Sequence, residues 1–146
     1  MQDTRLFVRY LILQARHLIW INRQRELSPY NISVGQSHIL GILHQIGHKV
    51  TLTELAKLTE RATSSTSVQL NRMENDGLVE KIRENPKSNL LSFTLTEKGR
   101  NIYKLCNKME ADKKIMSALS EAERQQLILM LEKIIYRAEK RLRSQT

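Results

Sequence analysis

The sequence predicts a mainly helical fold that contains one small β-hairpin. Three observations support this fold class. Apolar residues recur at helical spacing over most of the 146 residues, and three of the predicted helices open with a Ser/Thr-x-x-Glu/Gln capping pattern. Only residues 78–83 and 90–95 have the composition and alternation of strands. The sheet is therefore expected to be a minor part of a helical chain.

The composition indicates a basic, folded protein. The 24 Lys and Arg outnumber the 15 Asp and Glu, which gives a net charge of +9 and favours a polyanionic partner, nucleic acid first and an acidic membrane surface second. The single cysteine, Cys106, excludes a disulfide framework or a thiolate zinc site within one chain and fits a reducing cytoplasm. We find no signal-peptide layout and no membrane-spanning apolar run, so we expect a cytoplasmic protein.

Long helices are expected at both ends of the chain. Residues 4–27 carry an unusually wide apolar stripe, and Pro29 then interrupts the helical pattern. A helix is predicted from Thr96 to about Ile115, and a last one begins at Ser120. This last helix repeats apolar residues at helical spacing, namely Leu127, Leu131, Ile134, Ala138 and Leu142.

Three shorter helices are predicted in the middle of the chain. The first begins at Ser33 and ends at Gly47, and the second opens at Thr51. The third covers residues 63–76 and stops at Gly77, where a left-handed backbone is easily adopted. Its buried face should be formed by Thr66, Leu70 and Met73.

The order of these elements predicts a winged helix-turn-helix. A tight turn at residues 59–62 joins the second and third short helices, and the hairpin follows with a polar tip at residues 84–90. In this arrangement the third helix can enter the DNA major groove while the wing reaches the neighbouring backbone or minor groove. The sequence therefore favours DNA binding.

The motifs in these elements resemble those of the MarR family of bacterial winged-helix transcriptional regulators. They are Ile32-Ser33-Val34-x-Gln36-x-x-Ile39-Leu40, Leu52-Thr53-Glu54-Leu55-Ala56, the segment from Leu70 to Val79, and Leu95-Thr96-Glu97-Lys98-Gly99. The resemblance covers essentially the whole chain. It implies a homodimeric regulator, most often a repressor, on a roughly palindromic operator. It also implies a DNA-binding lobe at 31–95 and a dimerisation region formed by 1–30 plus 96–146.

The predicted DNA contacts lie on the third short helix and on the wing. Small hydroxyls at the start of the helix suit a phosphate, further polar side chains can bond base edges, and a valine can meet a thymine methyl. Capping or plain solvation is the alternative for each Ser and Thr. The candidates are Thr63, Ser64, Ser65, Ser67, Val68, Gln69, Asn71, Arg72, Arg83 and Lys87.

Two positions depart from the family pattern. Members of the family commonly carry Arg where this chain has Val68, and an arginine at the wing tip where this chain has Lys87-Ser88-Asn89. A lysine is a point charge and reads a narrow minor groove less well than arginine does. This departure keeps an alternative open, a helical protein-interaction module whose degenerate winged helix does not bind DNA.

Other chemistry is expected to be minor. The family resemblance implies that an aromatic or phenolic effector could bind near His17, Trp20, Tyr30 and His38 and weaken DNA binding, although core packing is the simpler explanation for each of these residues. Cys106 is expected to be a buried, inert thiol rather than a redox sensor. His44 and His48 have metal-ligand spacing, but Gly47 should end the helix between them. No phosphate loop, carboxylate cluster or nucleophile elbow predicts an enzyme or a cofactor.

The positive charge is spread unevenly along the chain. Residues 49–90, which hold the third helix and the wing, have seven basic against six acidic side chains, a net charge of +1. Residues 1–48 have +3 and residues 91–146 have +5. The order of the elements, rather than the total charge, therefore supports DNA binding.

Overall fold

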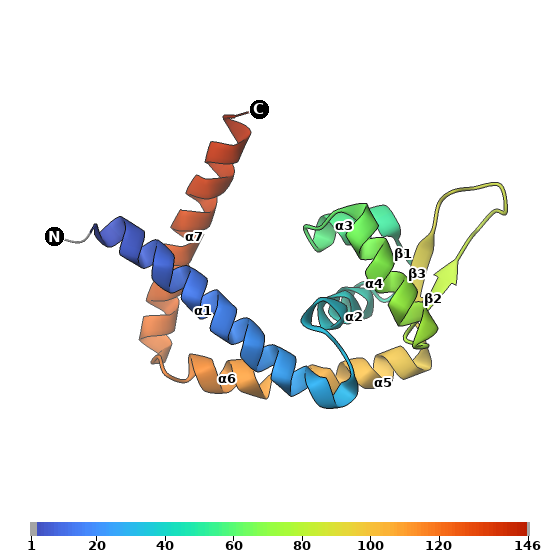
Figure 1. Ribbon diagram of the computed structural model, residues 1–146, viewed down its shortest axis with the longest axis horizontal. Helices are drawn as coiled ribbons and strands as arrows, with labels where there is room; N and C mark the ends of the chain where they lie inside the picture. Colours follow the sequence, from blue (N-terminus) through green and yellow to red (C-terminus); the bar gives the residue numbers. More distant parts are fainter. Residues whose placement is uncertain (1–2, 146) are drawn as a thin grey trace. The chain divides into compact units, whose positions relative to one another are not determined.

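The computed structural model describes residues 3–145 as a chain of helices with one small sheet (Figure 1). The chain divides into two compact units, one up to Met109 and one from Glu110 onward. The first unit contains the winged helix-turn-helix and the N-terminal helix. The second unit contains only helices.

The N-terminal helix α1 spans Thr4–Leu27 and is capped by the Asp3 carboxylate, which accepts a hydrogen bond from Arg5 N. The sequence predicts that Pro29 interrupts the helical pattern, and there the structure has a short 3-10 helix, η1, at Ser28–Tyr30 with Pro29 in its first turn. Asn31 then adopts a left-handed backbone with φ 55°, which redirects the chain into the next helix.

The helix-turn-helix follows the predicted capping pattern. Helix α2 covers Val34–Ile46, α3 covers Leu52–Leu58 and α4 covers Thr63–Asn75. Helices α2 and α3 each begin with a complete capping box, in which the N-cap hydroxyl and the third residue's side chain satisfy each other's backbone amides. Helix α2 ends at Gly47 with φ 74°, as predicted.

The sheet has three strands rather than the two that the sequence predicts. Strand β2 spans Val79–Ile82 and β3 spans Ser92–Leu95, and they pair in antiparallel register with Val79 opposite Leu95. A third strand, β1 at Val50–Thr51, pairs with β3 on its other edge. Two residues are too few to show alternation, so the sequence pattern could not reveal β1.

Helix α5, Glu97–Cys106, begins where the hairpin ends. Its N-cap, Thr96, donates from its hydroxyl to Gly77 O at 2.5 Å and accepts from Gly99 N at 3.0 Å. Gly99 is needed there because an added Cβ would lie 2.0 Å from Leu78 O. These contacts hold the wing against the start of α5.

One hydrophobic core joins the elements of the first unit. It takes side chains from the end of α1, the three short helices, all three strands and α5. Its largest fully buried members are Phe93, Leu27, Leu40, Leu55, Leu70 and Met73. The core fixes α4 and the hairpin relative to each other.

The second unit corrects one prediction. The sequence suggests a single helix from Thr96 to about Ile115, but the structure has a break at Asn107–Met109 between α5 and α6, Glu110–Met116. Met109 adopts φ 49°, a backbone that no glycine or proline announces in the sequence. Helix α7, Glu121–Arg143, opens with the predicted capping box at Ser120.

Within residues 3–145, no helix is long and apolar enough to cross a membrane.

Candidate nucleic-acid interface

Helix α4 has one buried and one open face. Thr66, Leu70 and Met73 are at most 1% exposed and form the buried face, as the sequence predicts. Thr66 also donates from its hydroxyl to Ala62 O at 3.0 Å, which uses this hydroxyl inside the fold. The remaining polar side chains of α4 are therefore the ones available to a ligand.

The first turn of α4 is open to solvent. Thr63, Ser64 and Ser65 are exposed, and no side chain caps the helix, because the N-cap residue is Ala62. The first amides of the helix thus lack a side-chain acceptor, and a helix N-terminus of this kind suits an anionic oxygen. Val68 lies one turn further on and is 52% exposed.

Two predicted contact residues are engaged within the fold. Asn71 Oδ1 accepts a hydrogen bond from Lys81 Nζ at 3.1 Å, and the same ammonium lies 3.8 Å from Glu74. Gln69 is half-buried against α2, where a Cβ added to Gly35 would lie 2.6 Å from its Nε2. Asn71 therefore faces strand β2, and Gln69 faces the start of α2.

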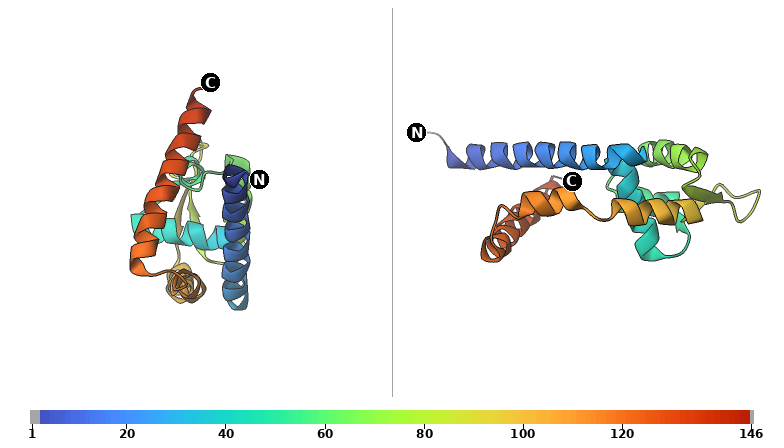
Figure 2. Two further views of the ribbon diagram at one scale, coloured as in Figure 1. Left: turned by 90° about the vertical axis from the view of Figure 1, so that its left-hand side faces the viewer. Right: turned by 90° about the horizontal axis from the view of Figure 1, so that it is seen from below.

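The wing extends beyond the helices of its unit (Figure 2, right). At its base Lys49 pairs with Glu84, which neutralises both side chains. At its tip Lys87 is exposed, and its backbone amide donates to Asn85 Oδ1 at 3.0 Å in a tight turn. The turn presents the Lys87 ammonium to solvent.

Five of the seven cations in residues 49–90 are unpaired. Within the described residues, no carboxylate lies within ion-pair distance of Lys57, Arg61, Arg72, Arg83 or Lys87. Arg61, in the turn between α3 and α4, is not among the sequence-predicted contacts. The sequence signal that could have indicated Arg61 is its position as a basic residue in the turn of the helix-turn-helix. The low net charge of this region thus includes several cations that no carboxylate neutralises.

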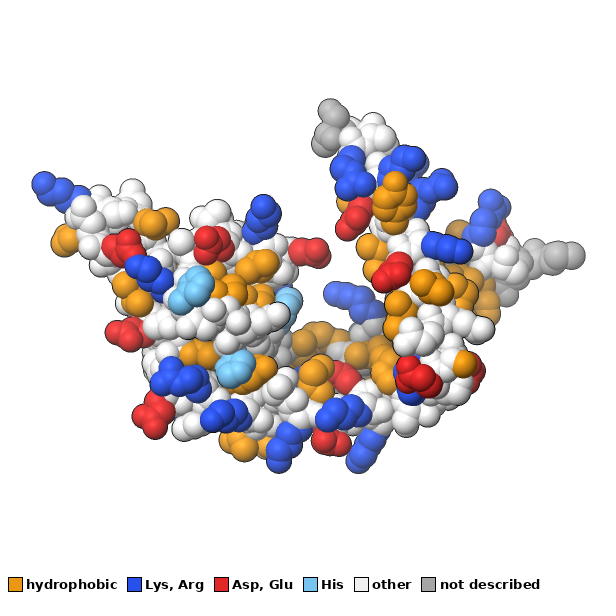
Figure 3. Space-filling model, turned by 180° about the vertical axis from the view of Figure 1, so that it is seen from behind, with side chains coloured by type: hydrophobic (Ala, Val, Ile, Leu, Met, Phe, Trp, Pro, Cys, Tyr) orange, Lys and Arg blue, Asp and Glu red, His pale blue; other side chains and the backbone are white. Residues whose placement is uncertain are grey.

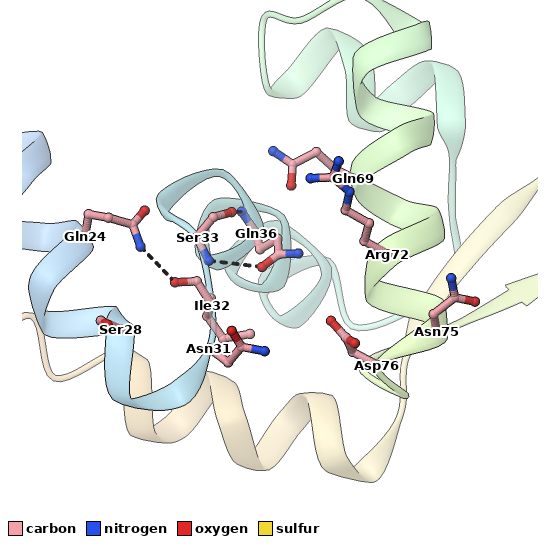
Figure 4. Close-up of a pocket in the computed structure, with 10 residues that line it drawn as sticks. All are labelled: Gln24, Ser28, Asn31, Ile32, Ser33, Gln36, Gln69, Arg72, Asn75 and Asp76. Atoms are coloured by element: carbon pink, nitrogen blue, oxygen red, sulfur yellow. Dashed lines mark hydrogen bonds between the residues drawn. The ribbon is translucent and has the colours of Figure 1, made fainter.

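A polar groove of about 620 Å³ lies between α2, η1 and α4 (Figure 4). Its lining is dominated by side-chain amides and hydroxyls, with one arginine and one aspartate: Gln24, Ser28, Asn31, Ile32, Ser33, Gln36, Gln69, Arg72, Asn75 and Asp76. A smaller hollow of about 140 Å³ adjoins it and includes Tyr30 and Lys98.

The effector candidates are dispersed. His17, Trp20 and His38 are exposed, and none of them lines either of these two hollows. Tyr30 packs against the core instead. Neither of these two hollows therefore combines the four residues.

Cys106 and His44, which the sequence analysis also considered, make contacts within the fold. Cys106 is 4% exposed, and burial raises the pKa of its thiol, although the nearby Arg23 charge opposes this shift. Arg23 also donates to Cys106 O at 2.8 Å and to Glu26 at 2.7 Å. His44 stacks on Tyr103 with ring centroids 4.1 Å apart. The described residues contain no cluster of three or more metal-ligating side chains.

Residues 30–87 match the model of the MarR family. The chain is also 28% identical over 113 residues to the HTH-type transcriptional regulator BilQ of Clostridium symbiosum, an alignment that covers 75% of this chain and 76% of BilQ. The matched family region spans the helix-turn-helix, strand β2 and the first part of the wing tip.

Solved structures of transcriptional regulators have a similar fold. The organohalide-sensing regulator RdhR-CbdbA1625, in its form with bound 2,4-dichlorophenol, superposes with a TM-score of 0.83 at 26% identity, covering 92% of this chain and 80% of that one. The DNA complex of MepR from S. aureus has the same fold, with a TM-score of 0.81 at 23% identity over 88% of this chain and 96% of MepR. Residues 30–87 of this chain therefore match the helix-turn-helix region of the MarR family of transcriptional regulators, and the chain shares the winged-helix fold of solved regulators of this kind.

Proposed function

We propose that this chain is a homodimeric repressor that binds a roughly palindromic operator. One α4 from each protomer enters the major groove, with the two recognition helices about one DNA turn, or roughly 34 Å, apart. The observation that carries the proposal is the open first turn of α4, where exposed Thr63, Ser64 and Ser65 stand next to the exposed Val68.

The readout follows from the chemistry of these side chains. Ser65 and Ser67 hydroxyls can donate to or accept from base edges, and Val68 offers an apolar contact to a thymine methyl. Arg72 and Arg83 supply charge for the DNA backbone. At the wing, residues 84–90 bring only Lys87 toward the backbone or minor groove, so we expect weaker minor-groove readout than an arginine would give.

Exposed apolar side chains on the terminal helices support a homodimer. Leu6, Tyr10 and Trp20 of α1 are 66%, 56% and 49% exposed, and Leu129 and Tyr136 of α7 are 62% and 61% exposed. Hydrophobic side chains also lie open along α7 in Figure 3, the arm that carries the C-terminus. Apolar surface of this extent is typical of an interface, and a second copy of the chain is the partner we propose.

We extend the proposal to an aromatic or phenolic effector that relieves repression. RdhR-CbdbA1625, 26% identical to this chain, has been solved with 2,4-dichlorophenol bound. His17, Trp20, Tyr30 and His38 are the candidates, and they would be completed by a second protomer. An effector that binds only a splayed dimer would shift the half-site spacing and weaken DNA binding. Because a repressor acts where its operator DNA is, the proposal includes a cytoplasmic location.

Selection of bound duplexes from random DNA, followed by titration at several salt concentrations, tests this function. We expect a two-fold symmetric site and an affinity that falls steeply with added salt. Arg72→Ala and Lys87→Ala should each weaken binding several-fold, whereas the control Lys104→Ala, on the exposed side of α5, should not. A wild-type protein that enriches no sequence and does not bind duplex DNA would support the protein-interaction module instead.

A further inference from the structure

The two buried residues of α1 both lie near its C-terminal end. Leu27 is completely buried in the core of the first unit, and Arg23, one turn earlier, is 9% exposed. From Arg23 back to Thr4, the side chains of α1 are exposed or only partly covered, and the helix extends beyond the other elements of its unit (Figure 2, right). Within the first unit, the direction of this long arm is therefore set by the contacts at its C-terminal end.

Arg23 joins the end of α1 to the end of α5. Its Nη1 donates to Glu26 Oε2 at 2.7 Å, and its Nη2 donates to Cys106 O at 2.8 Å. Cys106 is the last residue of α5, where backbone carbonyls lack partners within the helix and the helix dipole favours a cation. The guanidinium therefore acts as a cap on the C-terminus of α5 that is supplied by another helix.

Gln24, the next residue of α1, makes a second connection on another side of the helix. Its Nε2 donates to Ile32 O at 3.3 Å (Figure 4), and its Oε1 accepts from Val34 N at 3.2 Å. Consecutive residues of an α-helix point about 100° apart around its axis, so Arg23 and Gln24 hold α1 from two directions. One connection leads to α5 and the other to the start of α2.

The contacts of Arg23 contribute geometry more than stability. Removing a charge from water is costly, and a buried ion pair is often no more stabilising than an apolar pair of similar volume. An apolar pair could cover the same surface, but its contacts would let α1 turn on the core. The two hydrogen bonds from a planar guanidinium have fixed directions, so they hold α1 at one angle.

The length of α1 makes this angle important. Residues 4–23 of the helix span about 30 Å, so a rotation of about 10° at Arg23 moves the far end by about 5 Å. Successive base pairs of DNA are about 3.4 Å apart. A small change of angle at Arg23 therefore produces a displacement at the far end that exceeds one base-pair step.

We propose that Arg23 is a positioning residue that sets the half-site spacing of the operator. This role rests on the proposed homodimer, in which exposed apolar side chains of α1 contribute to the interface and α4 reads DNA. By tying α1 to α5, Arg23 fixes the angle between that interface and the core that carries α4. Because Arg23 is buried, it affects which spacing is bound rather than which bases are read.

A series of operators tests this role by fluorescence anisotropy. The selected half-sites are kept, and the spacer between them is lengthened or shortened by one or two base pairs. Wild type should lose at least about tenfold in affinity for a change of one base pair. Arg23→Met/Glu26→Met replaces the ion pair with apolar side chains and should reduce this preference to about threefold or less, while Tm and the dimer dissociation constant stay close to wild type. Arg25→Met, at an exposed position of the same helix, is the control and should keep the wild-type preference.

A second variant keeps the test decisive if the double variant does not fold. Arg23→Lys retains the charge without the planar fork and should also broaden the preference. If wild type prefers one spacing and the folded Arg23 variants prefer it as strongly, the role of Arg23 is overturned and the proposed function stands. A wild-type dimer that binds all spacings equally also overturns this role. If wild type binds no duplex DNA, or binds it as a monomer, the proposed function itself fails.

Discussion

The two compact units of this chain use similar apolar side chains in opposite ways. In the first unit Leu40, Leu55 and Leu70 are completely buried in a core shared by helices and strands. In α7 of the second unit, Leu129 and Ile135 are 62% and 55% exposed, and no residue of α7 is buried.

This difference indicates which apolar side chains stabilise the folded chain and which ones are available for association. Burying a leucine contributes roughly 1.5–3 kcal/mol, so the first unit gains its stability from its own core. Helix α7 gains little from its apolar residues until another surface covers them. We therefore expect the core of the first unit to fold independently of concentration, and α7, like the exposed apolar side chains of α1, to depend on a partner.

The largest effect should come from opening the core. Leu40→Ala removes a completely buried side chain and should lower the free energy of unfolding by about 2–5 kcal/mol. Chemical denaturation at two protein concentrations measures this, and the loss should be the same at both. Leu90→Ala, at a wing position that is 51% exposed, is the matched control and should change stability by less than about 0.5 kcal/mol.

A charged α7 should affect association more than folding. The double variant Ile128→Asp/Ile135→Asp places two carboxylates one heptad apart on exposed apolar positions and should raise the dimer dissociation constant about 100-fold or more. Sedimentation equilibrium measures this change. Lys133→Asp, at an exposed polar position of the same helix, is the control. A double variant that stays as dimeric as wild type would show that α7 is not the interface.

Loss of one cap should have a smaller, local effect. Thr51 and Ser120 open α3 and α7 with the same capping box, one beside the core and one outside it. Each change to alanine should destabilise its helix by about 1 kcal/mol. Hydrogen exchange measured by mass spectrometry should show faster exchange in α7 alone for Ser120→Ala. Faster exchange throughout both units would show that they unfold as one.

Local features of the fold were readable from the sequence. The capping boxes at Ser33, Thr51 and Ser120 and the helix end at Gly47 each depend on residues within one turn, and all are confirmed. Strand β1 and the left-handed Met109 were not predicted. The first depends on pairing with a segment about 40 residues away, and the second has no side-chain signal.

The candidate site was readable only in outline. The buried face of α4 follows from helical periodicity and is confirmed. The pairing of Lys49 with Glu84 and the closeness of Arg61 to Gly35 join residues that are distant in sequence, so no spacing rule reveals them. Which cations remain free for DNA is therefore a property of the tertiary structure.

The smallest effect concerns Cys106, which lies in the last turn of α5, just before the second unit begins. Burial raises the pKa of this thiol, so the native state holds the proton at a pH where the unfolded chain has released it. The thiol's contribution to stability is therefore complete below the unfolded pKa and declines as the pH rises above it, and Cys106→Ala should remove this part of the alkaline pH dependence. Alkylation by iodoacetamide at pH 8 should be at least about tenfold slower in the native protein than in denaturant, because the native thiol is less ionised and the reagent cannot easily reach it. Rapid alkylation of the native protein would show that the core opens around Cys106. The end of α5 would then be less firmly packed than the burial of Cys106 indicates.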